Sequence, residues 1–194
     1  PAASVPSLVD AFGHFRTTDE RTQLLAQARR DEVEIEFRAQ IDAVLAADLT
    51  PTHLDWHCLY DGGRADILDV TLALAKEYGL AIRAGSATLA GTLQHQGLPT
   101  NDHGFLDSFS IATPGKAARY ATLLRDLPPG LSEWAVHPGH ATAAAQALDG
   151  GWPVRQADFA FLTSPEARTL IRQEGIILLS YSPIRDAWGV MRDT

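Results

Sequence analysis

Hydrophobic positions recur with helical spacing in the segment from Asp31 to Asp48. Its apolar side chains repeat every three or four residues, at Val33, Phe37, Ile41, Val44 and Leu45. This spacing places them on one side of an α-helix and leaves the other side polar. The pattern therefore predicts an amphipathic helix that ends before Pro51.

Other segments show start and stop signals for further elements. Capping residues, proline in a first turn and terminal glycines predict helices that begin near residue 18 and that span 66–78, 114–127 and 165–174. Short apolar runs predict five strands, at 51–57, 80–83, 105–111, 131–137 and 176–181. Turn-forming residues predict a long surface loop over 85–104, and a Gly- and Ala-rich connection is expected after residue 139.

The order of these elements indicates an α/β fold. Four of the predicted strands start near residues 52, 80, 105 and 131, a spacing that suits repeated βα units and a parallel sheet. No linker divides the chain, so one domain over 1–194 is expected. Five strands are too few for an eight-unit barrel, which typically needs about 250 residues. Either the sheet is open, or barrel units are missing from the amino end.

Composition and charge narrow the class of partner. Hydrophobic residues make up 45% of the 194 residues, the net charge is −8, and the basic residues are scattered. This argues against nucleic acid or an anionic membrane as the partner. No apolar run approaches the roughly 18–20 residues of a membrane span. The single cysteine, Cys58, fits a reducing cytoplasm, and the start at Pro1 without Met suggests a partial polypeptide.

The stretch Pro51-Thr52-His53-Leu54-Asp55-Trp56-His57 holds the candidate chemistry. In a strand, side chains alternate between faces, so the two imidazoles and the carboxylate would share one face and Leu54, Trp56 and Cys58 the other, packed in the core. Imidazole and carboxylate are suitable ligands for Zn or Mn, although one strand cannot complete a site. A lone strand histidine is more often structural, but three such groups on one face are costly to bury without a use.

Polar residues also follow the other predicted strands, where parallel α/β folds collect their chemistry. These residues are Arg83, the segment 107–110, His137 and Tyr181. Glu133 and His137 would share a face of their strand. Glu133 could equally be a surface charge or a partner that orients a histidine, Arg83 could be only an ion-pair partner, and Arg155 lies in a loop-like region.

Two motifs resemble those of the YdjC-like carbohydrate deacetylases. The stretch 51–57 is similar to that family's PTHLDSHxHxH motif, and Glu133-Trp134-Ala135-Val136-His137-Pro138-Gly139 is similar to its T-E-x-x-x-H-P-G. The chain departs from the family pattern at Trp56, Leu59 and Asp61. The family's amino-terminal N-A-D-D and G-x-H segments have no counterpart here.

The resemblance implies a (β/α) TIM-like barrel, incomplete at the amino end, with a divalent metal ion (Mg, Zn or Mn) at its strand ends. It assigns His57 as a metal ligand, with His53 as a second candidate. His137 becomes the candidate general acid, and Asp55 a catalytic neighbour. The residues expected to contact substrate or to orient the site are Arg83, Glu133, Asp61 and Arg155.

The implied activity is metal-dependent removal of acetyl groups from N-acetylated sugars or related carbohydrate amides. The full-length protein is expected to be the enzyme, and this chain alone to be inactive. The alternative is a non-catalytic carbohydrate-binding or regulatory module that keeps the barrel without the metal site. The expected partner is an acetylated amino sugar, in the cytoplasm, and exposed strand edges would favour pairing as a homodimer or aggregation.

Overall fold

The computed structural model describes residues 2–57 and 59–190, apart from the side chains of residues 60, 189 and 190. The chain divides into two compact units, and each is described by itself. Unit 1 comprises Pro1–Thr100 and Ser180–Thr194, and unit 2 comprises Asn101–Leu179. Cys58, which was predicted to pack in the core, lies outside the described residues.

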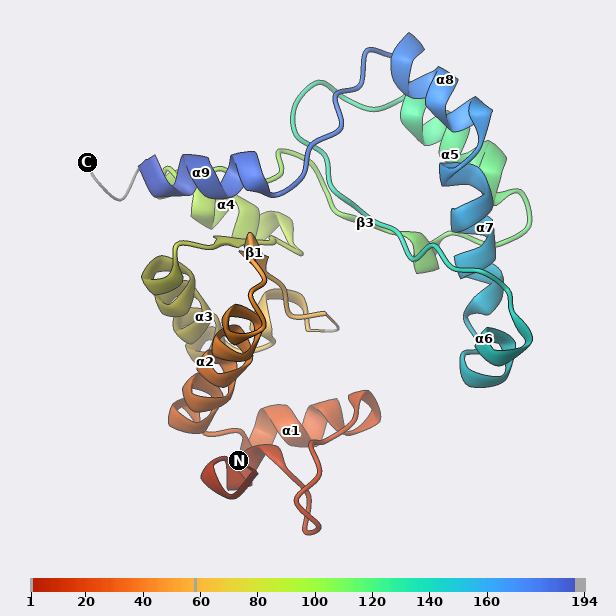
Figure 1. Cartoon of the computed structure of the whole chain (residues 1–194). Coiled ribbons are helices and arrows are strands. Elements are labelled where there is room, and N and C mark those ends of the chain that lie inside the picture. The colour runs from red at the N-terminus through yellow and green to blue at the C-terminus, as the bar shows by residue number, and fades with distance from the viewer. Residues whose placement is uncertain (1, 58, 191–194) are drawn as a thin grey trace. The chain divides into compact units, whose positions relative to one another are not determined.

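Unit 1 contains one short parallel sheet and helices packed around it (Figure 1). Its helices and strands are α1 (Arg21–Gln27), α2 (Arg30–Ala46), β1 (His53–Leu54), α3 (Ala65–Tyr78), β2 (Ala81–Ile82), α4 (Ala87–His95) and α9 (Ser182–Val190). Short 3₁₀ turns are η1 (Ala2–Ser4), η2 (Pro6–Leu8), η3 (Thr18–Glu20) and η4 (Tyr60–Gly62).

The sheet of unit 1 is a βαβ arrangement formed by β1, α3 and β2. The two strands are parallel, with His53 opposite Ala81 and Leu54 opposite Ile82. Gly79 ends α3 in the left-handed conformation (φ 69°), which glycine adopts without steric cost. The chain therefore turns at once into β2, whose two side chains are buried.

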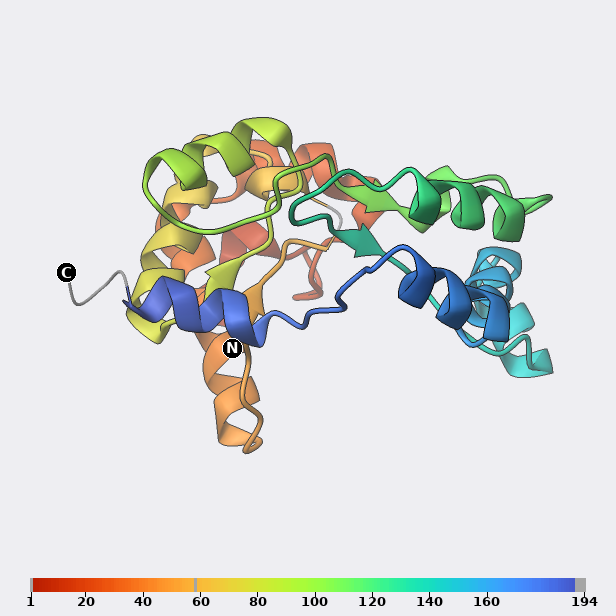
Figure 2. The same cartoon turned by 90° about the horizontal axis from the view of Figure 1, so that it is seen from above.

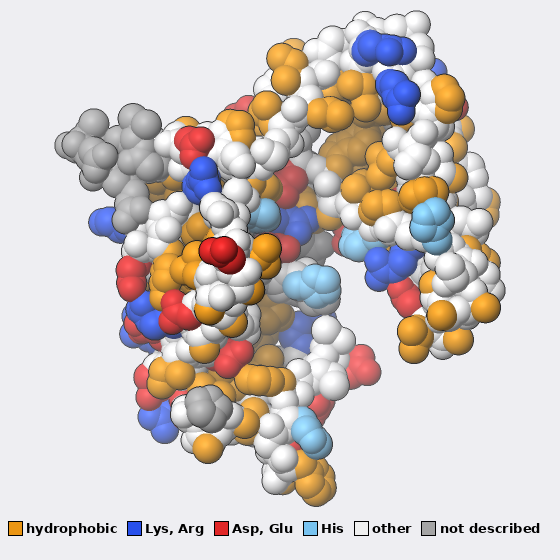
Figure 3. All heavy atoms as spheres, viewed as in Figure 1, with side chains coloured by type: hydrophobic (Ala, Val, Ile, Leu, Met, Phe, Trp, Pro, Cys, Tyr) orange, Lys and Arg blue, Asp and Glu red, His pale blue; other side chains and the backbone are white. Residues whose placement is uncertain are grey.

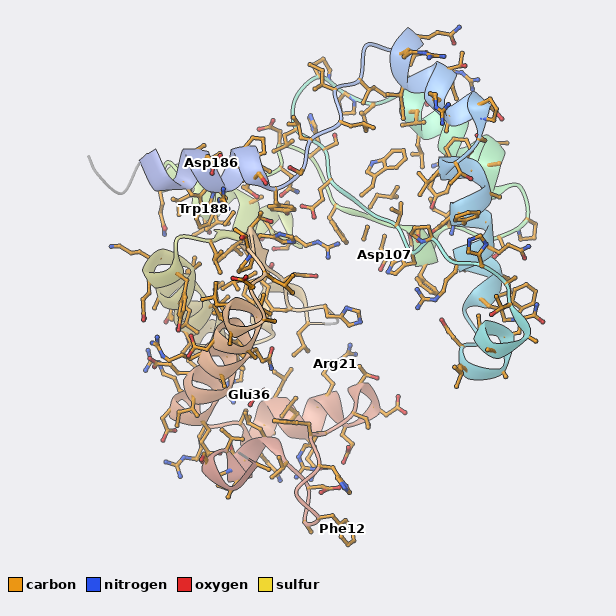
Figure 4. The ribbon with its side chains drawn as sticks, viewed as in Figure 1. Phe12, Arg21, Glu36, Asp107, Asp186 and Trp188 are labelled. Atoms are coloured by element: carbon orange, nitrogen blue, oxygen red, sulfur yellow. The ribbon has the colours of Figure 1, made fainter. Side chains whose placement is uncertain are left out.

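Helix α9 brings the carboxyl-terminal part of the described chain back to unit 1. Trp188, labelled in Figure 4, is buried in a cluster with Ile82 and Leu93. Its indole Nε1–H donates to the carbonyl of Pro99 at 2.6 Å. Burying a tryptophan with its N–H satisfied contributes a large apolar area to a core, so α9 is an integral part of this unit.

Unit 2 repeats the βαβ arrangement with β3 (Leu106–Asp107), α5 (Lys116–Arg125) and β4 (Trp134–Ala135). The strands pair in parallel, with Leu106 opposite Trp134 and Asp107 opposite Ala135. The unit also contains η5 (Ser108–Ser110), α6 (Ala143–Leu148), α7 (Trp152–Leu162) and α8 (Pro165–Gln173). Helices α5 and α8 lie side by side, as Figure 2 shows, over a core that includes Tyr120, Leu124 and Phe161.

The prediction of an α/β fold with parallel strand pairing is confirmed. Helices predicted at 31–48, 66–78, 114–127 and 165–174 are present as α2, α3, α5 and α8. The strands are shorter than predicted, and the described residues form two two-stranded sheets. This arrangement does not by itself show a barrel.

Three predictions along the chain were wrong. Residues 85–104 are not one long loop, because α4 forms within them and buries Leu89, Ala90 and Leu93. The connection after residue 139 contains α6 and α7. The run 176–181 forms no strand, and Ile177 and Leu178 remain 80% and 74% exposed.

The face of the molecule drawn in Figure 3 carries acidic and basic side chains next to one another, without a large patch of one charge. This agrees with the scattered basic residues of the sequence. Within residues 2–57 and 59–190, no helix combines the length and the apolar character needed to cross a membrane.

Candidate functional site

The predicted strand at 51–57 ends early, and a loop takes its place. β1 stops at Leu54, and His57 has a left-handed backbone (φ 54°) in a turn. The prediction that His53, Asp55 and His57 share one strand face is therefore wrong, since alternation holds only while the backbone is extended. A non-glycine residue in this conformation is strained by about 1–2 kcal/mol, and such strain often occurs at functional sites.

Asp55 directly follows β1 and is paired with Arg83. The Arg83 guanidinium donates to Asp55 Oδ2 at 2.8 Å, and the backbone N–H of Arg83 donates to the carbonyl of Leu54 at 3.1 Å. Strand pairing thus continues for one residue beyond β1 and β2 and sets the two side chains next to each other. Arg83, for which an ion-pair role was one of the alternatives, therefore forms an ion pair with Asp55.

His53 is held by packing. Its ring stacks on Tyr181 with centroids 3.8 Å apart and an interplanar angle of 12°. Its Nδ1 lies 3.0 Å from the hydroxyl of Thr52. Burial lowers the pKa of the His53 imidazole; the charge of Asp55 acts against this shift and that of Arg83 adds to it. The fold therefore disfavours the protonated form of His53.

Asp61 offers an oxygen suited to a cation. It lies in η4, also with a left-handed backbone (φ 54°). Its Oδ2 accepts a hydrogen bond from Ser86, the residue that caps α4. Its Oδ1 is buried and has no hydrogen-bond partner within the described part of the chain. A buried carboxylate oxygen without a donor costs free energy unless a cation or water satisfies it.

The side chains of His57 and Asp61 are chemically suited to bind a divalent ion, but they do not make a complete ligand set. The Asp61 carboxylate and the exposed imidazole of His57 are ligand types that Zn and Mn accept. Over residues 2–57 and 59–190, no group of three or more His, Cys, Asp or Glu side chains is placed to hold a metal ion.

His137 lies in unit 2, two residues after β4, and its ring is held on two sides. The Ser108 hydroxyl lies 2.9 Å from His137 Nδ1. The ring of Phe109 meets the imidazole edge-on, with centroids 4.7 Å apart. The carboxylate of Asp107, labelled in Figure 4 where β3 gives way to η5, is 3.9 Å from Nδ1. The imidazole is 26% exposed, so it is partly accessible to a substrate.

Behind His137 lies a buried polar cluster formed by Ser108, Lys116, Tyr120 and Asp158, each at most 1% exposed. Asp158 Oδ2 accepts the backbone N–H of His137 at 2.9 Å. Its Oδ1 accepts from the Tyr120 hydroxyl at 2.8 Å and from the Lys116 ammonium at 2.9 Å. Lys116 also donates to the carbonyl of Ser108 at 2.7 Å.

The cluster keeps its carboxylate ionised. Burial alone would raise the pKa of the Asp158 carboxyl. Hydrogen bonds from Ser108, Lys116, the His137 backbone and Tyr120 outweigh burial and hold this pKa below its usual range. Burial, together with the hydrogen bond to Asp158, raises the pKa of the Tyr120 hydroxyl. Tyr120 therefore stays a neutral donor to an anionic Asp158.

The two remaining predicted site residues also lie in unit 2. The backbone carbonyl of Glu133 accepts the N–H of Leu106 at 3.1 Å, next to β4. Glu133 and His137 lie outside β4, so strand alternation does not put them on one face as predicted. Arg155 lies on α7 and not in a loop; it pairs with Asp149 and sits 5.5 Å from the centre of the Phe109 ring.

The predicted residues thus form two sets. Unit 1 holds His53, Asp55, His57, Asp61 and Arg83, and unit 2 holds Glu133, His137 and Arg155. Sequence reasoning noted residues 107–110 at a strand end but missed the cluster behind His137. Asp158 gave no signal of its own, because its segment was predicted to be part of a connection, where a carboxylate is usually solvated.

Known proteins are similar to this chain in sequence and in fold. The family model described as YdjC-like protein matches residues 1–173. A carbohydrate deacetylase from Thermus thermophilus is 32% identical over 186 residues, which span 89% of this chain and 67% of that protein. A carbohydrate deacetylase from Geobacillus stearothermophilus is 29% identical, over 93% of this chain and 70% of its own length.

A solved structure from Enterococcus faecalis, described as a cellobiose-phosphate cleavage protein, matches with a TM-score of 0.75. It is 28% identical and covers 95% of this chain, which spans 71% of that structure. The family match extends over most of the sequence, including both motifs, and the chain therefore belongs to the YdjC-like family.

Proposed function

We propose that this protein is a carbohydrate deacetylase that hydrolyses the acetamide group of an N-acetylated sugar. The observation that carries the proposal is the held imidazole of His137, whose Nδ1 lies 2.9 Å from Ser108 and whose backbone is bound by Asp158. A histidine fixed in this way and still partly exposed suits proton transfer. The relatives named carbohydrate deacetylases supply the substrate class.

In the proposed reaction, water adds to the acetyl carbonyl carbon and the bond from that carbon to nitrogen breaks. The proton that the attacking water loses passes through Nε2 of His137 to the departing amine, and acetate and a free amino sugar are released. Asp55 and Arg83 form a fixed ion pair that would contact the polar groups of the sugar. Within unit 2, Glu133 and Arg155 are proposed to support His137.

A divalent ion is part of the proposal, with His57 and Asp61 as the ligands best placed by their chemistry and His53 as a further candidate. When bound, such an ion would polarise the acetyl carbonyl and lower the pKa of a water molecule. The buried Oδ1 of Asp61 supports this assignment.

We also propose the finer architecture that the family resemblance implies, a single (β/α) TIM-like barrel domain. The parallel βαβ arrangement in each unit supports it. A cytoplasmic location and pairing as a homodimer remain predictions.

The test is release of acetate from N-acetylated mono- and disaccharides by the protein encoded by the full gene, with added Mg²⁺, Zn²⁺ or Mn²⁺. We expect activity, and we expect His137→Ala and His57→Ala to lower kcat/KM by at least about 100-fold, the usual scale for acid–base groups. His95→Ala, at the exposed carboxyl end of α4, is the matched control and should retain activity. Full activity in both site variants would reject the assignment.

The alternative of a non-catalytic carbohydrate-binding module receives no support from the names of the relatives. It makes the opposite prediction in the same assay. Saturable sugar binding without any acetate release would favour it.

A further inference from the structure

We propose that Phe109 is the platform on which an uncharged sugar ring packs next to His137. The proposed subsite lies within unit 2 and consists of the Phe109 ring, the Asp107 carboxylate and the Arg155 guanidinium. The proposal rests on the proposed function in taking a carbohydrate as the substrate and His137 as the reacting imidazole. It adds the residue that holds the sugar ring and the charge that this ring can carry.

The first observation is that Phe109 is exposed beside the candidate acid. Phe109 lies in η5 and is 43% exposed, and its ring centroid is 4.7 Å from that of the His137 imidazole. A single exposed aromatic residue is common on protein surfaces and has no meaning by itself. Here its place gives it one, because a molecule that packs on the accessible part of Phe109 lies next to His137.

The second observation is that Phe109 is held in position by the protein. Its backbone N–H donates to Asp107 Oδ1 at 2.9 Å. The ring packs against Gly151, where an added Cβ would lie 2.7 Å from Phe109 Cε1, so glycine is needed for this close approach. The guanidinium carbon of Arg155 is 5.5 Å from the ring centre, and Arg155 is itself paired with Asp149. A side chain that is fixed beforehand loses little conformational entropy when a ligand binds.

The chemistry of these groups suits a sugar ring. A pyranose presents C–H groups with a small positive charge, and the face of an aromatic ring is negative, so the two attract and exclude water. The hydroxyl groups at the rim of the sugar need polar partners. The Asp107 side chain is 35% exposed and can accept a hydrogen bond, and the Arg155 side chain is 39% exposed and can donate one. An apolar surface with a few polar groups is the usual composition of a ligand site.

The charges around Phe109 favour an uncharged sugar. Asp107 binds the backbone of Phe109, and Asp149 binds the backbone N–H of Gly151 at 2.7 Å. The guanidinium near the ring, that of Arg155, is already paired with Asp149. These two carboxylates and one guanidinium sum to one net negative charge, which repels a phosphate or carboxylate group on a ligand. The subsite therefore fits a neutral N-acetylated sugar better than a sugar phosphate.

Saturation-transfer NMR of the full-length protein with methyl β-glucopyranoside tests the platform without turnover, because this sugar has a pyranose ring and no acetamide. We expect the strongest saturation on the C–H protons of one face of the sugar. Phe109→Leu should weaken binding by about 3- to 10-fold, the scale of an aromatic contact, and Phe109→Tyr should preserve it. Phe12→Leu, at an 85% exposed phenylalanine of unit 1, is the matched control and should bind as the wild type does.

The deacetylase assay separates a binding role from mere packing against His137. With N-acetylglucosamine, Phe109→Leu should raise KM by about 3- to 10-fold and change kcat by less than about 2-fold, the pattern of a lost binding contact. Phe109→Tyr should restore KM. N-acetylglucosamine 6-phosphate should give a lower kcat/KM than the neutral sugar.

Absence of methyl glucoside binding by the wild type would overturn the platform, and so would unchanged binding in Phe109→Leu. A fall in kcat with unchanged KM would also overturn it, because the ring would then only support the imidazole. An equal or higher kcat/KM for the phosphorylated sugar would reject the preference for an uncharged ring. Sugar binding that depends on Phe109, in a protein that releases no acetate, would reject the proposed function and leave the platform standing.

Discussion

Asp158 binds His137 through its backbone and not through its ring, with 2.9 Å between the carboxylate Oδ2 and the backbone nitrogen. The same carboxylate anchors Lys116 and Tyr120 from α5. The position of the candidate acid is therefore tied to the packing of α5 against α7. Stability and function should be affected together by changes in this cluster.

Replacing Lys116 by Met should destabilise the protein by about 3–5 kcal/mol, because a buried carboxylate would lose its charged partner. The two side chains are 1% and 0% exposed, with nitrogen and oxygen 2.9 Å apart. Urea unfolding measures the loss. Arg38→Met is the control, since it breaks an exposed ion pair with Glu77 that solvent screens. An equal loss in the two variants would contradict the buried role of Lys116.

Low pH should lower the free energy of unfolding, because the Asp158 carboxylate becomes protonated. Its folded pKa lies below the ordinary 3.8, so its ionised form stabilises the protein above that pH. The contribution is lost as the pH falls through 3.8 toward the folded value, because the unfolded chain then binds more protons. The free energy of unfolding should differ most between wild type and Asp158→Asn near neutral pH. This difference should shrink toward pH 3, whereas a constant difference would argue against the shift.

His53 should make the stability of the protein depend on pH in a range closer to neutrality than the range in which Asp158 acts. Its folded pKa lies below the ordinary 6.5 because of burial. As the pH falls from 6.5 through the folded value, the unfolded chain is protonated first and stability declines. His53→Phe keeps an aromatic ring against Tyr181 and should flatten the decline in Tm between pH 8 and pH 5. His14→Asn, at a 78% exposed side chain, should leave the decline as it is in the wild type.

Gly62→Ala should disturb the loop that carries His57 and Asp61. Gly62 has φ +74°, and an added Cβ would lie 3.1 Å from Ile67 and 3.2 Å from the indole nitrogen of Trp56. The left-handed conformation alone costs a non-glycine residue about 1–2 kcal/mol. Unfolding free energy and tryptophan fluorescence should both change.

Gly91→Ala is the matched control for this loop. Gly91 lies within α4, and a Cβ there would meet open space. Alanine favours a helix over glycine by about 1 kcal/mol, so this variant should be neutral or slightly more stable. A loss of stability in Gly91→Ala equal to that in Gly62→Ala would show that the strain at Gly62 is unimportant.

The helical spacing of apolar residues was a reliable predictor where a helix packs along its whole length, as for α2 and α3. The strand at 51–57 was overextended because alternation was read past Leu54, although a strand lasts only as long as its partner. β2 supplies two residues and the N–H of Arg83. Helix α4 was missed because Gly91 and its Ser and Thr neighbours resemble a loop. Tertiary packing of Leu89 and Leu93 stabilises it, together with the Ser86 cap.

The site was predicted only in part, because some of its residues have no local signal in the sequence. His57, Arg83 and His137 stand at or near strand ends, where parallel sheets gather polar groups, and their identity was visible in the motifs. Asp158 is 21 residues from His137 in sequence and has no motif of its own. Its importance depends on a fold that brings α5, α7 and the end of β4 together, which no local pattern reveals.

The return of α9 to unit 1 has a consequence for how the chain is made. Unit 2 is continuous in sequence, whereas the core of unit 1 needs Trp188, which follows the whole of unit 2. During synthesis the ribosome therefore delivers every residue of unit 2 before it delivers the tryptophan that covers Ile82 and Leu93. Until then, the cluster around Ile82 and Leu93 lacks Trp188, and the core of unit 1 can be completed only after the whole of unit 2 has been made.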